Sequence, residues 1–170
     1  MKPLITNLND ALTFQLEGMH DAEKRIQKYF PSMVRHASSI KLRNEMSKYL
    51  ESASDKRVKL KRIFSYLLCG PFKRKNIAME DLLADMKSQS KLTTISVLRD
   101  RINIANLQSI IQVKISVYQN ALICSEQLNL QTVTDLLEEI LSWERETYKA
   151  LTKIALDLVS RKVTALTLPN

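Results

Sequence analysis

Four charged side chains that fall on apolar helical faces are the residues best placed to do chemistry in this 170-residue chain. A helical projection at about 100° per residue puts Glu23, Arg57, Lys114 and Glu144 each within the apolar stripe of a separate segment. Inward carboxylates are typical of a metal site, but two inward cations beside them favour an internal ion cluster. A buried charge without a partner is costly, so such groups are expected to pair.

We therefore predict an internal cluster of Glu23, Lys114 and Glu144. Arg57 is either a fourth member of this cluster or extends along the bundle edge. The alternative for both cations is that their long side chains reach solvent while their stems pack on apolar surface. A glutamate is too short to do this, so the interior position is the stronger prediction for the two carboxylates.

The sequence lacks the common motifs of enzymes. It contains no phosphate-binding glycine-rich loop, no G-x-S-x-G and no H-E-x-x-H, and it has only two glycines. The two histidines, His20 and His36, cannot complete a two-metal site, which needs about six or more ligands. We predict a protein that is not an enzyme and that holds neither a cofactor nor a metal.

The elements that would position these residues are four long helices. Apolar periodicity predicts helices at residues 9–37, 41–68, 94–127 and 132–161, with a kink at Pro31. Residues 69–92 form a basic loop with a short helix at "AMEDLLADMK", and residues 162–170 a frayed tail. Two short connections and one long one predict an all-α, ferritin-like antiparallel four-helix bundle, in which two helical hairpins are joined by a long crossover.

Composition and charge fit one domain spanning residues 1–170, with its core at about 8–160. No apolar run is long enough to cross a membrane, and Cys69 and Cys124 are expected to be reduced, so we expect a cytoplasmic protein. The net charge is +8, which leaves nucleic acid open as a less favoured partner. The basic patch that motivates this alternative comprises Lys56, Arg57, Lys59, Lys61, Arg62, Lys73, Arg74 and Lys75.

Several segments resemble the ferritin-like YciE/YciF family. "MHDAEKRIQKYFPSM" is similar to the signature of its first helix, and "YLESASDKRVKLKRIF" to the pattern of its second. "RDRINIANLQSIIQVKISVYQNAL" and "LLEEILSWERETYKALTKIA" resemble its third and fourth long helices. The resemblance spans about residues 8–158 and implies a domain of unknown function, a stress-associated role and a homodimer.

The departures from this family concern the carboxylates that would hold two metals. Its E-H-Y-E stretch reads "IQVK" here, so Lys114 stands where the family carries a glutamate. Its E-E pair reads Trp143 and Glu144, and its E-E-T stretch begins at Glu51. The resemblance thus implies a degenerate metal-site region at Glu23, Glu51, Lys114 and Glu144. We expect a non-catalytic structural or stress-associated protein; the alternative is residual binding of iron or manganese.

Overall fold

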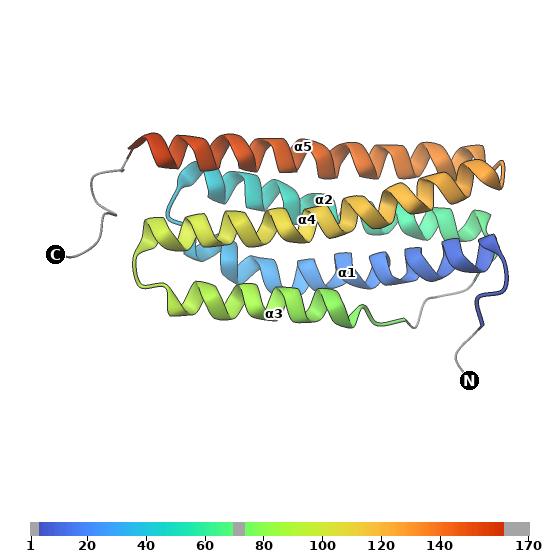
Figure 1. Cartoon of the computed structure of the whole chain (residues 1–170), viewed down its shortest axis with the longest axis horizontal. Helices are drawn as coiled ribbons and strands as arrows, with labels where there is room; N and C mark the ends of the chain where they lie inside the picture. The colour runs from blue at the N-terminus through green and yellow to red at the C-terminus, as the bar shows by residue number, and fades with distance from the viewer. Residues whose placement is uncertain (1–3, 70–73, 162–170) are drawn as a thin grey trace.

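The computed structural model describes residues 4–69 and 74–161, and every regular element in these ranges is a helix (Figure 1). The helices are α1 (Leu8–His36), α2 (Ile40–Tyr66), α3 (Ile77–Leu92), α4 (Ser96–Gln127) and α5 (Gln131–Arg161). The ends of the four long helices lie within two residues of the predicted ones. The predicted frayed tail lies outside the described residues.

Local sequence signals account for the starts of α1, α2 and α3. Asn7 accepts a hydrogen bond from the Asp10 amide at 2.9 Å, and Asn76 accepts one from the Met79 amide at 3.0 Å. Ser39 caps α2 in the same way. Each satisfies an amide that the first helical turn leaves without a partner. Helix α1 continues through Pro31 to His36.

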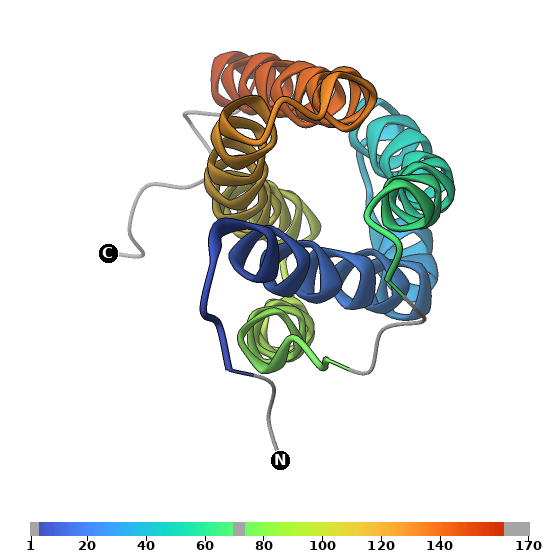
Figure 2. The same cartoon turned by 90° about the vertical axis from the view of Figure 1, so that its right-hand side faces the viewer.

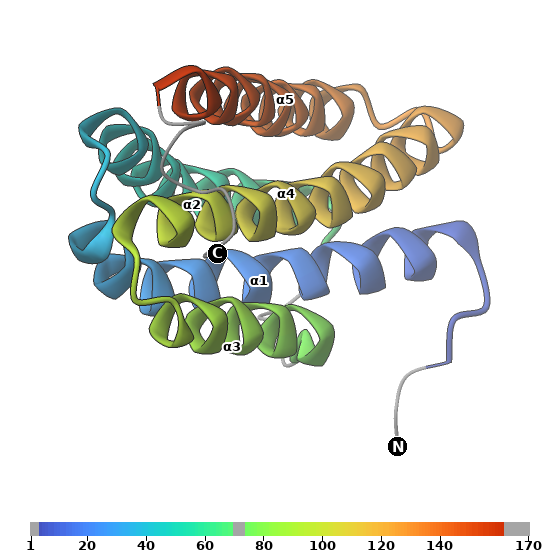
Figure 3. The same cartoon turned by 60° about the vertical axis from the view of Figure 1, so that its left-hand side comes forward.

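The four long helices form two antiparallel hairpins, α1–α2 and α4–α5 (Figure 1). Viewed along the bundle, α1 lies beside α4 and α2 beside α5, so each helix has two antiparallel neighbours (Figure 2). Helix α3 packs on the outside of the bundle, against α1 and α4 (Figure 3). In sequence it lies between the two hairpins, and it carries the chain back along the bundle from the first hairpin to the second. This confirms the predicted ferritin-like bundle, although the 16-residue α3 is longer than the predicted short helix.

Buried residues alternate at spacings of three and four along each long helix. In α2 the series is Leu42, Met46, Tyr49, Ala53, Lys56, Leu60 and Ile63. This seven-residue repeat is the pattern that keeps one seam of a helix facing its neighbours in a left-handed bundle. The resulting core is mainly aliphatic, with Phe30, Tyr49, Phe64 and Tyr118 as its buried aromatic side chains.

A buried carboxylate fixes the turn between α1 and α2. Asp100, in the first turns of α4, accepts hydrogen bonds from the Ser38 amide at 3.0 Å and the Ser39 amide at 2.7 Å. The Ser38 hydroxyl also donates to it, at 2.5 Å. These donors compensate the desolvation of Asp100 and tie the two hairpins together at one end of the bundle.

None of the described helices is long and apolar enough to cross a membrane.

Candidate functional site

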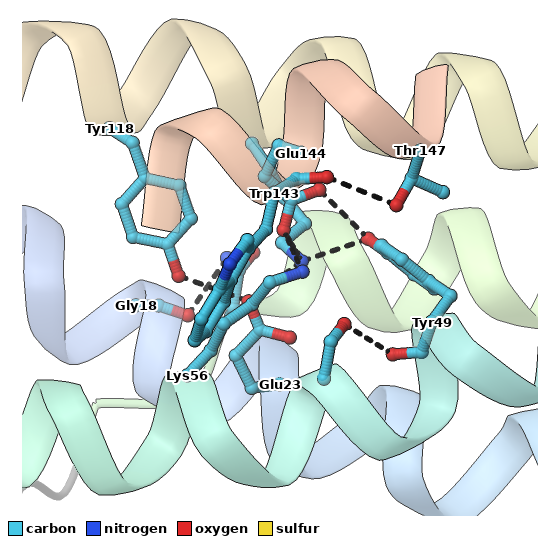
Figure 4. Close-up of polar contacts among 11 residues, drawn as sticks. Gly18, Glu23, Tyr49, Lys56, Tyr118, Trp143, Glu144 and Thr147 are labelled. Atoms are coloured by element: carbon cyan, nitrogen blue, oxygen red, sulfur yellow. Dashed lines mark hydrogen bonds and ion pairs between the residues drawn. The ribbon is translucent and has the colours of Figure 1, made fainter. Parts of the chain in front are cut away.

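Each helix of the bundle contributes one charged side chain to the middle of the core. They are Glu23 from α1, Lys56 from α2, Lys114 from α4 and Glu144 from α5, here called the core ion cluster. Figure 4 shows Glu23, Lys56 and Glu144 within this cluster. All four side chains are 0% exposed. Two carboxylates and two ammonium groups make the cluster neutral, so it avoids the large cost of an unbalanced buried charge.

Lys114 is the centre of the cluster. Its Nζ lies 2.7 Å from Glu23 Oε1 and 2.5 Å from Glu144 Oε1. It also donates a hydrogen bond to the Tyr49 hydroxyl at 2.8 Å. An ammonium group has three protons and no acceptor, so these three oxygens match its donor capacity. The ammonium group therefore joins the carboxylates of α1 and α5, which are on opposite hairpins.

Lys56 supplies the second cation. Its Nζ lies 2.6 Å from Glu144 Oε1, the same oxygen that Lys114 contacts. Both ammonium groups also lie near the Tyr49 ring, at 4.5 Å for Lys56 and 4.8 Å for Lys114 from its centroid. An aromatic face attracts cations when water is excluded. Tyr49 thus offsets part of the repulsion between the two lysines.

Two tyrosine hydroxyls add hydrogen bonds to the carboxylates. Tyr49 donates to Glu144 Oε2 at 3.1 Å, and Tyr118 donates to Glu23 Oε1 at 3.0 Å. The two rings approach the cluster from opposite sides (Figure 4). Burial and the nearby carboxylates raise the pKa of both tyrosines well above the ordinary value. Both phenols therefore stay protonated at neutral pH and act as donors.

The pKa shifts of the cluster show which charges it stabilises. Burial alone would raise the pKa of Glu144, but the ammonium groups of Lys114 and Lys56 lower it below the ordinary value. Burial would lower the pKa of Lys114, but Glu144 and Glu23 raise it overall. Lys56 differs, because burial and repulsion from Lys114 lower its pKa. The Lys114–Glu144 pair is therefore the strongly held part of the cluster.

The structure brings together three of the four residues predicted for the internal cluster. Glu23, Lys114 and Glu144 are in contact, whereas Arg57 is half-buried and donates to Gln27 Oε1 at 2.6 Å. Lys56 takes the place considered for Arg57. A projection at 3.6 residues per turn drifts by about 20° per heptad from the true seam. The seven-residue spacing of Tyr49, Lys56 and Ile63 was the signal that could have identified Lys56.

Glu51 and most of the predicted basic patch lie elsewhere. Glu51 is exposed, so it is not part of the cluster, and Lys56 is buried within it. Lys59 pairs with Glu139, and the Arg74 guanidinium lies 3.6 Å from the centroid of the Phe14 ring. The exposed members of the patch in the described chain are Lys61, Arg62 and Lys75, and Lys73 lies outside the described residues. In the described chain the predicted patch therefore has fewer exposed cations than the sequence indicates.

The residues of the core do not fit a carboxylate-bridged two-metal centre. Among the described residues, no three His, Cys, Asp or Glu side chains are grouped as metal ligands. Glu23 and Glu144 instead direct Oε1 at one shared ammonium group, that of Lys114. A metal ion would have to displace the ammonium group of Lys114. The displaced lysine would then remain as a second buried positive charge beside the metal ion. Cys69 and Cys124 are free and half-buried.

Comparison with known proteins defines the class. The family model described as "Domain of unknown function (DUF892)" matches residues 7–164, so the chain belongs to this family of helical bundles. Protein YciF of Escherichia coli (strain K12) is 26% identical over 156 residues, which are 91% of this chain and 94% of that protein.

Solved structures agree with this assignment. The crystal structure of the E. coli stress protein YciF matches with a TM-score of 0.87 and 25% identity, over 93% of this chain and 100% of that one. YcfI from Rhodopseudomonas palustris, described as a proposed structural protein, matches with a TM-score of 0.85. Its identity is 21%, over 89% of this chain and 97% of that one.

The hydrogen bond from Tyr118 to Glu23 provides a first test of the cluster. Tyr118→Phe should destabilise the protein by about 1.5–3 kcal/mol, because it removes a hydrogen bond to a buried charged group. Tyr148→Phe is the matched control, since no hydrogen bond of its hydroxyl is found in the described chain. Urea unfolding of both variants measures the difference. Equal stability of the two variants would show that the Tyr118 hydroxyl does not support Glu23.

Proposed function

We propose that this protein is a non-catalytic, structural or stress-associated bundle of the YciF type, working as a cytoplasmic homodimer. The names of two similar proteins, a stress protein and a proposed structural protein, support the role. The family resemblance supports the dimer. The observation that carries the non-catalytic part is the position of Lys114 Nζ, 2.7 Å from Glu23 and 2.5 Å from Glu144.

The chemical basis of the proposal is a substitution of cations. In a two-metal bundle, bound metal ions neutralise the interior carboxylates and keep them ionised. Without metal, such carboxylates must become protonated, be lost, or acquire another cation. The family resemblance implies that Lys114 stands at the position of a glutamate, and it brings a positive charge on the chain itself. With Lys56 it balances both glutamates, which leaves no need for a metal.

The cluster supports a structural role rather than extra stability. A buried ion pair contributes little compared with well-packed apolar residues, because desolvation offsets most of the attraction. Its contacts are directional, however, and join all four helices at one level of the bundle. We propose that this fixes the register of the two hairpins. No residue of the cluster is exposed to a substrate.

Elemental analysis tests the proposed loss of the metal site. The protein should be produced in medium supplemented with iron and manganese, purified without chelators and analysed by mass spectrometry of its metals. We expect far less than one metal ion per chain, because the carboxylates are already paired. A ferritin-like protein that retains its metals serves as the control for the purification. About two metals per chain, as in carboxylate-bridged bundles, would support residual metal binding instead.

A further inference from the structure

A second feature of the molecule is a positively charged pocket lined by residues of α1, α3 and α4. The ends of α1 and α3 and the start of α4 lie together at one end of the bundle (Figure 1, Figure 3). The volume of the pocket is about 230 Å³. None of its described lining residues carries a carboxylate. The lining residues are Ser32, Met33 and His36 from α1, Lys87, Ser90 and Lys91 from α3, and Arg99 from α4. We call it the α1–α3–α4 pocket.

The three cations of this pocket have no acidic partner. Within the described part of the chain, Lys87, Lys91 and Arg99 form no ion pair with an Asp or Glu side chain. Other surface cations do so, as when Lys41 pairs with Asp157 at 2.6 Å. The pocket therefore concentrates positive charge that the described residues do not neutralise with carboxylates.

The partial charges at the helix ends neutralise only a small part of this positive charge. Cations are favourable at helix C-termini, and α1 and α3 each contribute about −0.5 of an elementary charge there, while the start of α4 contributes about +0.5. The sum is far smaller than three full positive charges. Moreover, Ile95 precedes α4 without a side-chain cap, so the first amides of α4 receive no such hydrogen bond.

Arg99 and His36 in this pocket each form hydrogen bonds to a backbone carbonyl. Each still has one nitrogen that a ligand could contact. Arg99 donates from Nε at 3.0 Å and from Nη2 at 2.8 Å to the Thr93 carbonyl, which leaves Nη1. His36 donates from Nδ1 to the Ser32 carbonyl at 2.5 Å, which leaves Nε2. A planar guanidinium, two ammonium groups and a serine hydroxyl are the groups that recognise phosphate oxygens.

We propose that the α1–α3–α4 pocket binds a small free oxyanion of the phosphate class, either inorganic phosphate or the phosphate group of a small metabolite. Its volume lies below the roughly 300–1,000 Å³ of pockets that enclose drug-sized ligands, which favours a compact anion. Lys87, Lys91 and Arg99 supply the charge, Ser90 supplies a hydroxyl donor, and His36 Nε2 can accept a hydrogen bond from a protonated phosphate oxygen. The pocket lies among the ends of α1, α3 and α4, apart from the core ion cluster.

Isothermal titration calorimetry with inorganic phosphate at low ionic strength tests this proposal. We expect saturable binding at one site per chain. Lys87→Gln and Lys91→Gln should each weaken binding by about tenfold or more, as expected for a charge-assisted hydrogen bond. Lys149→Gln, which removes an exposed lysine on α5, should leave the affinity unchanged. Circular dichroism checks that each variant is folded.

Three results would overturn the proposal. The first is no saturable binding at millimolar phosphate. The second is an equal loss of affinity in Lys91→Gln and Lys149→Gln, which would indicate a general charge effect. The third is binding to a double-stranded oligonucleotide but not to phosphate, which would identify a surface for nucleic acid. Competition by phosphate with a small phosphate monoester would support it and show that both enter the same pocket.

Discussion

Replacing Lys114 with methionine is expected to lower the free energy of unfolding by about 3–5 kcal/mol, the usual cost of breaking a buried pair from one side. For a chain of this size, this corresponds to a fall of roughly 6–20 °C in Tm. Methionine fills a similar volume, so packing changes little and the loss is electrostatic. Glu23 is the most affected group, because Lys114 is its ion-pair partner in the described chain. Thermal unfolding followed by circular dichroism measures the effect.

The matched control restores charge balance. In Lys114→Met combined with Glu23→Gln, the remaining Lys56–Glu144 pair is neutral, so much of the lost stability should return. Glu23→Gln alone should not be stabilising, because it leaves two lysines opposite one carboxylate. An unchanged Tm for Lys114→Met would show that the cluster contributes nothing to the fold. Failure of the double variant to recover would show that packing, rather than charge, explains the loss.

The effect of Lys114 should persist over a wide range of pH. The pKa of Lys114 is raised in the folded protein above its ordinary value of 10.5. Its stabilising contribution is thus fully present below pH 10.5 and is lost only as the pH rises through the raised folded value. In Lys114→Met, by contrast, the cluster carries an excess negative charge, which the uptake of a proton can neutralise. The variant should therefore approach the stability of the wild type as the pH falls.

Glu144→Gln is the second substitution for which we expect a large loss, again of about 3–5 kcal/mol at neutral pH. It leaves Lys56 and Lys114 facing Glu23 as the sole carboxylate of the cluster. The pKa of Glu144 is lowered below its ordinary value of 4.5. Its contribution is therefore present above pH 4.5 and is lost as the pH falls through the lower folded value.

The pH dependence of the Glu144→Gln variant should have the opposite sign to that of Lys114→Met. Its excess charge is positive, so it should regain stability as the pH rises and Lys56, whose pKa is already lowered, loses its proton. Glu139→Gln is the matched control on the same helix, because Glu139 pairs with Lys59 at the surface. A surface pair contributes about 0–1 kcal/mol. Similar losses in both variants would contradict the special role of the buried cluster.

The sequence predicts the fold well because the governing signals are long and repeated. Two short connections and one long one determine the order of the hairpins, and Asn7 and Ser39 lie at the starts of α1 and α2. The inward positions of Glu23, Lys114 and Glu144 also follow from periodicity. A charged side chain within a long apolar stripe must point toward the core unless it is long enough to reach solvent. A glutamate is shorter than a lysine, so its inward position is easier to predict.

The exact membership of the cluster is harder to predict. Lys56 and Arg57 are adjacent, and which of them faces inward depends on whether α2 repeats at 3.5 or 3.6 residues per turn. The seven-residue spacing from Tyr49 through Lys56 decides this, but only a bundle with supercoiled packing makes that spacing the relevant one. Tyr49 and Tyr118 read as ordinary apolar positions in the sequence. Their hydroxyls gain a role only when helices far apart in the chain meet.

The α1–α3–α4 pocket could not be anticipated from sequence at all. Its cations come from α3 and α4 and its histidine from α1, and none of them forms a run of basic residues. The predicted basic patch extends in sequence from Lys56 to Lys75, yet the structure buries Lys56, pairs Lys59 with Glu139 and places Arg74 against the Phe14 ring. Continuity of charge along a helix says little about continuity in space, because successive residues point about 100° apart.

The most direct test of the central claim is the ionisation state of Lys114 in the folded protein. Nitrogen-15 NMR of the lysine side chains reports it, with the Lys114 signal assigned by its absence in Lys114→Met. If Lys114 supplies the positive charge between Glu23 and Glu144, its Nζ should show a protected ammonium signal that persists at least to pH 10.5, the ordinary pKa. A neutral amine at neutral pH, or rapid exchange with solvent, would contradict the account.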